Sequence, residues 1–110
     1  MLNEDHIKKR ISSDDFYWSK HSMDKCDQYG YDIDIIKEEI VKQGELIEGL
    51  YRYGYGSKYL LYVNSRVNGE YHVAIVHEFG MQNVKITTIY KPDSRFKVDN
   101  KTRVDSGGLF

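Results

Sequence analysis

Cysteine, proline, long apolar runs and net charge are all scarce in this chain, and each scarcity excludes something. The single cysteine, Cys26, excludes an intrachain disulfide and a zinc site built from cysteines. The longest apolar run spans residues 59–63, far short of the roughly 18 residues that a membrane helix needs. The opening stretch MLNEDHIKKRISSDD is too polar for a secretory signal. We therefore expect a cytoplasmic protein in a reducing compartment, with no segment in the membrane.

The net charge of −1 argues against a protein whose whole surface attracts nucleic acid. The charge is unevenly distributed, however. Residues 1–90 carry eleven Lys and Arg against fourteen Asp and Glu, a net −3, whereas residues 91–104 carry five basic against two acidic residues, a net +3. This predicts a local basic patch of the size that holds a few phosphates. The alternative is a basic segment that serves only solubility.

The residues that are present favour one folded domain over the whole chain, 1–110. Hydrophobic residues make up 40% of the sequence, and ten Tyr, four Phe and one Trp supply large side chains for a core. A chain of 110 residues can bury one core and hardly two. We expect residues 13–104 to be folded and both ends, 1–12 and 105–110, to be flexible.

Helical periodicity dominates the first part of the chain. Residues 14–29 carry apolar side chains on one helical stripe, with a cap at Ser12, Ser13 or Asp14 and a stop at Gly30; the stripe contains Phe16, Met23, Cys26 and Tyr29. A second amphipathic helix is predicted over residues 33–43, between Asp32 and Gly44.

Strand signals dominate the rest. Runs rich in β-branched and aromatic residues lie near 46–53, 57–67, 70–79 and 84–91, separated by segments that contain glycine. The pair Asn68-Gly69 between two runs predicts a hairpin with a type I′ turn. The fold class is therefore predicted as α+β, with two helices packed on one mainly antiparallel sheet of about four strands.

Several fragments, taken in order, resemble a known bacterial family. They are HSMDKCDQYGYDIDIIKEEIVKQGELIEGLY, YLLYVN, YHVAIV and ITTIYKPD, within residues 17–97. They resemble a family of domains of unknown function whose pattern runs H-x-x-x-R on a helix, then a His-Val-Val strand, then Thr-x-Tyr-x-Pro. That family is grouped with the barnase, EndoU, colicin and RelE superfamily of RNases, many of them toxins.

The resemblance implies a RelE-like or barnase-like fold and a toxin-type endoribonuclease that needs no metal and no cofactor. Its partners would be RNA and a cognate antitoxin or immunity protein. One position departs from the pattern, because Lys25 stands where the family has Arg, and a further Arg of the family is also missing near Gln28 and Tyr29. Lysine keeps the charge but lacks the fork that grips phosphate through two hydrogen bonds, so activity could be altered or absent.

RNA cleavage without metal needs a base for the 2′-hydroxyl proton, an acid for the leaving oxygen and cations for the phosphorane charge. His21 and Lys25, four residues apart on the predicted helix, share a face away from the apolar stripe and could point at one ligand. The alternative is a pair of surface side chains on a solvated helix.

His72 and His77 lie in one apolar strand, where alternation places them on opposite faces. They therefore cannot share one site. The family pattern favours His72, and the small Ala74 beside it would leave room for a substrate. The alternative is a core histidine, and because both faces of the strand are apolar, the sequence does not decide which face meets the helices.

Tyr90 ends the last strand and could orient phosphate or a 2′-hydroxyl, with Thr88 beside it. The basic residues that follow could bind phosphate; they are Arg95, Lys97 and Arg103. The predicted catalytic set is thus His21, Lys25, His72 and Tyr90. The alternative is a non-catalytic binding protein on the same fold, which inhibits or regulates a host or phage protein or serves as an immunity or antitoxin partner.

Overall fold

The computed structural model describes residues 2–104 as three helices and five strands. In chain order these are α1 (Glu4–Ser12), β1 (Phe16–Trp18), α2 (Lys20–Tyr29), α3 (Ile33–Gln43), β2 (Glu45–Tyr53), β3 (Gly56–Ser65), β4 (Gly69–Glu78) and β5 (Val84–Tyr90). The α+β class is as predicted. None of the helices in this part of the chain has the length and apolar content to cross a bilayer.

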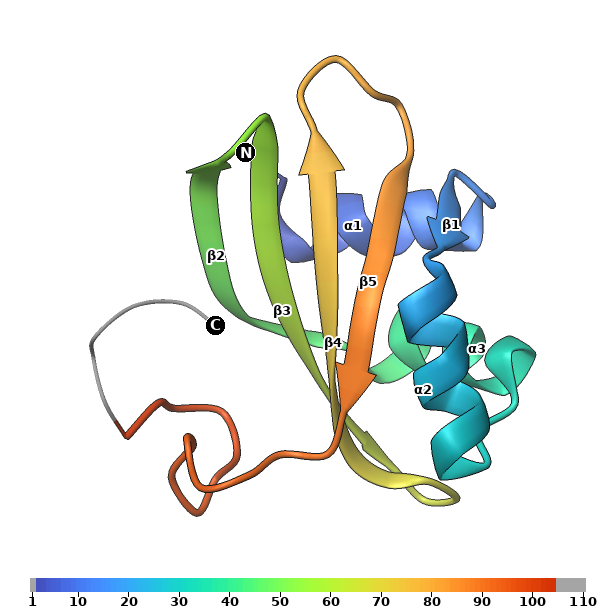
Figure 1. Cartoon of the computed structure of the whole chain (residues 1–110), viewed down its shortest axis with the longest axis vertical. Helices are drawn as coiled ribbons and strands as arrows, with labels where there is room; N and C mark the ends of the chain where they lie inside the picture. The colour runs from blue at the N-terminus through green and yellow to red at the C-terminus, as the bar shows by residue number, and fades with distance from the viewer. Residues whose placement is uncertain (1, 105–110) are drawn as a thin grey trace.

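The strands form one mixed sheet in the order β1-β5-β4-β3-β2 (Figure 1). Strands β2 to β5 pair as antiparallel neighbours and correspond to the four predicted runs. The prediction missed a fifth strand, because β1 pairs in parallel with β5, with Phe16 opposite Val84 and Trp18 opposite Ile86. This pairing joins two segments that lie far apart in the sequence.

The predicted helix over residues 14–29 is wrong in its first part. Asp14 has a φ of +60°, a left-handed conformation that does not continue a helix, and residues 16–18 then form β1. Helix α2 begins after Ser19, whose side chain caps it by accepting the N–H of Ser22. Its buried face carries Ser22 and Cys26, whereas Met23, predicted for the apolar stripe, is 44% exposed. The predicted helix over 33–43 is confirmed as α3.

Helix α1 corrects the prediction of a flexible start. Ile7 and Ile11 lie one helical turn apart and are fully buried in the main core. Asn3 caps the helix by accepting the N–H of His6. Residues 4–12 are therefore an integral element. The other segment predicted as flexible, 105–110, lies outside the described residues.

The two faces of the sheet have different covers. Helices pack on one face, where alternate residues of β4 (Tyr71, Val73 and Ile75) enter the main core (Figure 1). The opposite face carries His72 and Ala74, and here a smaller cluster forms between Leu60, Ala74 and Phe96. Phe96 comes from residues 91–104, which we call the strap. The strap therefore covers the face that the helices leave open.

The predicted hairpin exists, but its turn is different. Strands β3 and β4 close with Ser65 opposite Gly69, so residues 66–68 form the loop, and positive φ occurs at Gly69 and not at Asn68. A type I′ turn needs positive φ at both central residues and is therefore excluded. The Ser65 hydroxyl accepts the N–H groups of residues 67 and 68 and donates to Glu39 of α3. This buried carboxylate ties α3 to the turn.

Candidate functional site

A groove of about 490 Å³ opens where the end of β5 meets α2 and the strap. Four cations and one carboxylate are among the residues that line it. They come from α2, β3, β4, β5 and the strap: Lys25, Tyr29, Lys58, Ala74, Thr87, Thr88, Tyr90, Lys91, Asp93 and Arg95. We call this the Tyr90 groove.

Local geometry explains why α2 borders this groove. Strand β1 covers only the first residues of β5, and α2 contacts the edge that remains. The Ser19 hydroxyl donates to the Thr87 carbonyl at 2.9 Å, and the Ser22 hydroxyl donates to the Ile86 carbonyl at 3.0 Å. The Ile86 carbonyl also accepts the backbone N–H of Ser19 at 2.9 Å, so the two serine hydroxyls add to a backbone contact and hold α2 against the edge of β5.

A β-bulge shapes the floor of the groove. Thr88 lies opposite Ala74 while Ile86 lies opposite Ile75, so Thr87 is the extra residue on β5. The Thr87 hydroxyl donates to the Ala74 carbonyl at 3.2 Å. The bulge brings two consecutive threonines to the groove lining, beside the small side chain of Ala74.

Lys25 and Lys91 converge on the ring of Tyr29. Their ammonium nitrogens lie 5.8 Å and 5.5 Å from its centroid. Within residues 2–104, neither lysine forms a salt bridge with a carboxylate. Two positive charges held near one ring repel each other, and the Tyr29 face offsets only part of this repulsion. An anion bound between them would be stabilised by both.

Arg95 adds a third cation, already partly neutralised. Its Nε donates to both oxygens of Asp93, at 2.9 Å and 3.1 Å, and its guanidinium lies 5.0 Å from the ring centroid of Tyr90. The contact with Arg95 lowers the pKa of Asp93, and that with Asp93 raises the pKa of Arg95. Because Asp93 contacts Nε, the terminal nitrogens take no part in this contact.

Lys58 is a groove residue that the sequence reasoning missed. It lies on β3 opposite Val76 and shares its face with Leu60 and Tyr62. Burial, and to a smaller extent the charge of Arg103, lower the pKa of Lys58. The available signal was a single lysine directly before the apolar run YLLY, within a predicted strand.

His72 lies directly behind Tyr90. The two residues are register partners on β4 and β5, and their ring centroids are 5.3 Å apart at an interplanar angle of 83°. Tyr90 lines the groove, whereas His72 is fully buried beneath Phe96, with ring centroids 4.4 Å apart. Its Nε2 lies 2.7 Å from the Asn100 carbonyl, which can only accept, so Nε2 carries a proton.

Nδ1 of His72 and the hydroxyl of Tyr90 are two of the three buried side-chain polar atoms without partners in the described residues, and the third is Oδ1 of Asn83. Burial is the main cause that lowers the pKa of His72 and raises the pKa of Tyr90. At neutral pH the imidazole is therefore neutral, with the lone pair of Nδ1 unused, and the phenol keeps its proton.

The structure brings part of the predicted site together. Lys25, Thr88, Tyr90 and Arg95 all line the Tyr90 groove, with His72 behind them. Besides His72, three predicted residues do not line it. His21 and Lys97 are exposed elsewhere, and Arg103 donates from Nε and Nη2 to Glu48 at 2.7 Å and 2.9 Å. The shared helix face thus does not bring His21 into the groove with Lys25.

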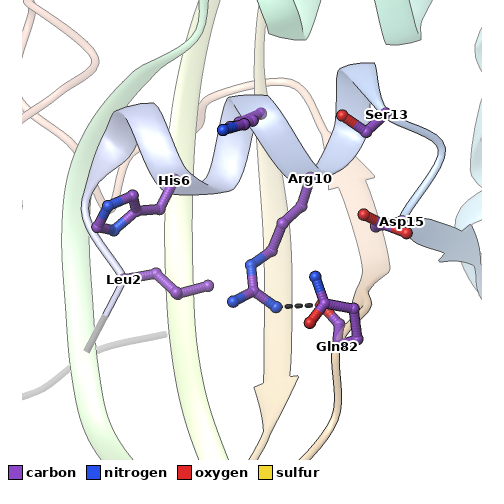
Figure 2. Close-up of a pocket in the computed structure, with 7 residues that line it drawn as sticks. Leu2, His6, Arg10, Ser13, Asp15 and Gln82 are labelled. Carbon is purple, nitrogen blue, oxygen red and sulfur yellow. Dashed lines mark hydrogen bonds between the residues drawn. The ribbon is translucent and has the colours of Figure 1, made fainter.

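A second hollow of about 420 Å³ lies between α1 and the turn that joins β4 to β5. Figure 2 shows Arg10 reaching from α1 to the backbone carbonyl of Gln82, with His6 and Leu2 to one side. The same guanidinium lies 3.5 Å from Nε2 of His77, and Asp15 contributes a carboxylate to the lining. These contacts engage Arg10 within the protein, so the Tyr90 groove is the stronger candidate site.

Comparison with known proteins adds no assignment, since no protein-family model, curated protein or solved structure matches this chain. The geometry of the Tyr90 groove is therefore the main indication of function. Within residues 2–104, no three His, Cys, Asp or Glu side chains are grouped so that they could hold a metal ion.

Proposed function

We propose that this protein is a toxin-type endoribonuclease that binds single-stranded RNA in the Tyr90 groove and cleaves it with its own side chains. The RelE-like or barnase-like character of the fold belongs to the same proposal. The observation that carries it is the convergence of Lys25 and Lys91 on one aromatic ring, beside the buried hydroxyl of Tyr90.

The groove has the features that single-stranded nucleic acid requires. A phosphate between Lys25 and Lys91 would remove their mutual repulsion, and Arg95 can reach a neighbouring phosphate oxygen through its terminal nitrogens. Aromatic faces beside cations favour unstacked bases, which are available in single strands and not in duplexes. The hydroxyls of Thr87 and Thr88 offer partners to a ribose 2′-hydroxyl, the group that distinguishes RNA from DNA.

The same residues supply the chemistry. In the proposed reaction, RNA binding brings the Tyr90 hydroxyl and Nδ1 of His72, which do not hydrogen-bond to each other in the unbound protein, into one proton path. The 2′-hydroxyl loses its proton along this path to Nδ1, and the 2′-oxygen forms a bond to phosphorus. The bond from phosphorus to the 5′-oxygen breaks, and the ammonium of Lys58, with its lowered pKa, donates a proton to that oxygen. Lys25 and Lys91 stabilise the charge of the phosphorane. The products are a 2′,3′-cyclic phosphate and a 5′-hydroxyl.

The test is cleavage of labelled single-stranded RNA in excess EDTA, with product ends identified by mass spectrometry. We expect cyclic phosphate ends, and we expect Tyr90→Phe to lower the rate by roughly 10² or more, the usual effect of losing a proton-transfer group. The control is Tyr17→Phe, which removes a hydroxyl from an exposed tyrosine on β1. Cleavage that depends strictly on a divalent ion, or equal rates for wild type and Tyr90→Phe, would contradict the mechanism.

Two observations favour a second candidate, a non-catalytic binding protein on the same fold. His72 is sealed beneath the strap, and His21 lies outside the groove. Such a protein would regulate or inhibit a host or phage protein, or act as an immunity or antitoxin partner. Absence of both RNA cleavage and RNA binding at low salt would favour this second function.

A further inference from the structure

Asn100 is held in an unusual conformation directly over His72. Its φ of +59° places it in the left-handed region, which costs energy for most residues and least for Gly and Asn. Its backbone N–H donates to the Lys97 carbonyl at 2.8 Å, and its side-chain amide donates to the carboxylate of Glu70. Glu70 in turn accepts the hydroxyl of Tyr62 at 2.9 Å.

These contacts orient the backbone carbonyl of Asn100. With its backbone N–H and its side chain both engaged, Asn100 directs its carbonyl at Nε2 of His72, at 2.7 Å. A carbonyl can only accept, so the imidazole proton is held on Nε2 and the lone pair on Nδ1. Nδ1 is therefore a buried acceptor without a partner in the described residues, and its ring lies next to that of Tyr90.

We propose that Asn100 is a positioning residue, whose carbonyl holds His72 in the tautomer and orientation that make Nδ1 the proton acceptor behind Tyr90. The proposal rests on the proposed function, because it names the group that prepares the base for that reaction. Glu70 and Tyr62 support it by fixing the side chain of Asn100. Loss of the group that orients a metal-ligating histidine typically costs about 10-fold to 100-fold in activity, and we expect a loss of the same order here.

In the described residues, the imidazole of His72 forms one hydrogen bond, the one to the Asn100 carbonyl. Its neighbours are the rings of Tyr62, Tyr90 and Phe96 and the backbone of Asn100. The charged groups that influence it are Glu48, Asp93 and Arg95, none of which hydrogen-bonds to the imidazole. A substitution at Asn100 should therefore change the protonation pattern of the His72 imidazole before it changes other properties.

The experiment compares Asn100→Val with Asn100→Gly. Both variants remove the side-chain amide, so they differ in the backbone. Valine disfavours positive φ, whereas glycine adopts positive φ easily and keeps the carbonyl in place. Asp14→Val is the matched control, because Asp14 is also a left-handed residue, with a φ of +60°, and lies outside the groove lining. Two readouts are measured: the nitrogen-15 shifts and proton exchange of the His72 ring by NMR, and kcat and KM for RNA.

We expect the wild type to show a slowly exchanging proton on Nε2 and the shift of an unprotonated Nδ1. Asn100→Val should lose that protection, show averaged nitrogen shifts and lower kcat by 10-fold to 100-fold with little change in KM. Asn100→Gly should retain most of the proton protection on the His72 ring and most of kcat. Asp14→Val should leave the ring signals and kcat unchanged.

The two readouts separate this proposal from the proposed function. Unchanged nitrogen shifts and exchange in Asn100→Val would overturn the positioning role, whether or not the protein cleaves RNA. An equal loss of kcat in Asp14→Val would also overturn it, because strain alone would then explain the effect. Absence of cleavage by a wild type that shows the expected ring signals would count against the endoribonuclease and not against the hydrogen bond.

Discussion

Removing the two lysines over Tyr29 gives the sharpest test of where RNA binds. Lys25 and Lys91 are the groove cations for which the described residues provide no ion pair, so each should contact phosphate directly. Each phosphate contact to a single strand contributes about 0.7 to the slope of log affinity against log salt concentration. The double variant Lys25→Ala with Lys91→Ala should therefore flatten that slope by about 1.4.

The assay is titration of a short labelled single-stranded RNA at several salt concentrations. The matched control is Lys20→Ala with Lys42→Ala, which removes the same charge from lysines paired with Asp24 and Glu38 outside the groove. The control should lower affinity slightly and leave the slope near that of the wild type, because distant exposed charges are screened. Equal slopes for both double variants would refute the assignment of the groove as the phosphate site.

Three further predictions concern the framework of the site. Arg103→Ala should lower the free energy of unfolding by about 3 kcal/mol in urea titrations, because it leaves the Glu48 carboxylate, only 9% exposed, without its cation; a change below about 0.5 kcal/mol would contradict the buried pair. Because burial lowers the pKa of His72, the unfolded state binds a proton more readily than the folded state as the pH drops below about 6.5. The free energy of unfolding should therefore fall over this pH range, and His72→Gln should flatten this dependence. Ile11→Ala should cost about 2–5 kcal/mol by the same measurement, whereas a frayed segment would show almost no effect.

Sequence periodicity predicted the elements that have a regular apolar pattern or clear caps. Helix α3 has Asp32 before it and Gly44 after it, and strands β2 to β5 are rich in β-branched and aromatic residues. Helix α1 was missed because it contributes only Ile7 and Ile11 to the core and is otherwise polar. Strand β1 was missed because three residues show no periodicity, and its parallel partner begins at residue 84.

The candidate site was predicted in part for a similar reason. Tyr90, Thr88 and Arg95 are close in sequence, so their grouping follows from the end of one strand. Lys25 lies beside them only because α2 packs against the edge of β5. No local sequence pattern predicts this packing. The face of His72 was undetermined because β4 is apolar on both sides, and only the strap makes the second side a core.

The parallel pairing of β1 with β5 also constrains the order in which this chain can fold during synthesis. Residues 16–18 leave the ribosome early, but their partners at 84–86 follow only after both hairpins have been made. Closing so long a loop is entropically costly, and contacts at such separation slow folding. The nascent chain must therefore keep Phe16 and Trp18 unpaired while most of the sheet forms. Strand β5, arriving last, both captures β1 and completes the groove at Tyr90, so a truncated product lacking it would have neither.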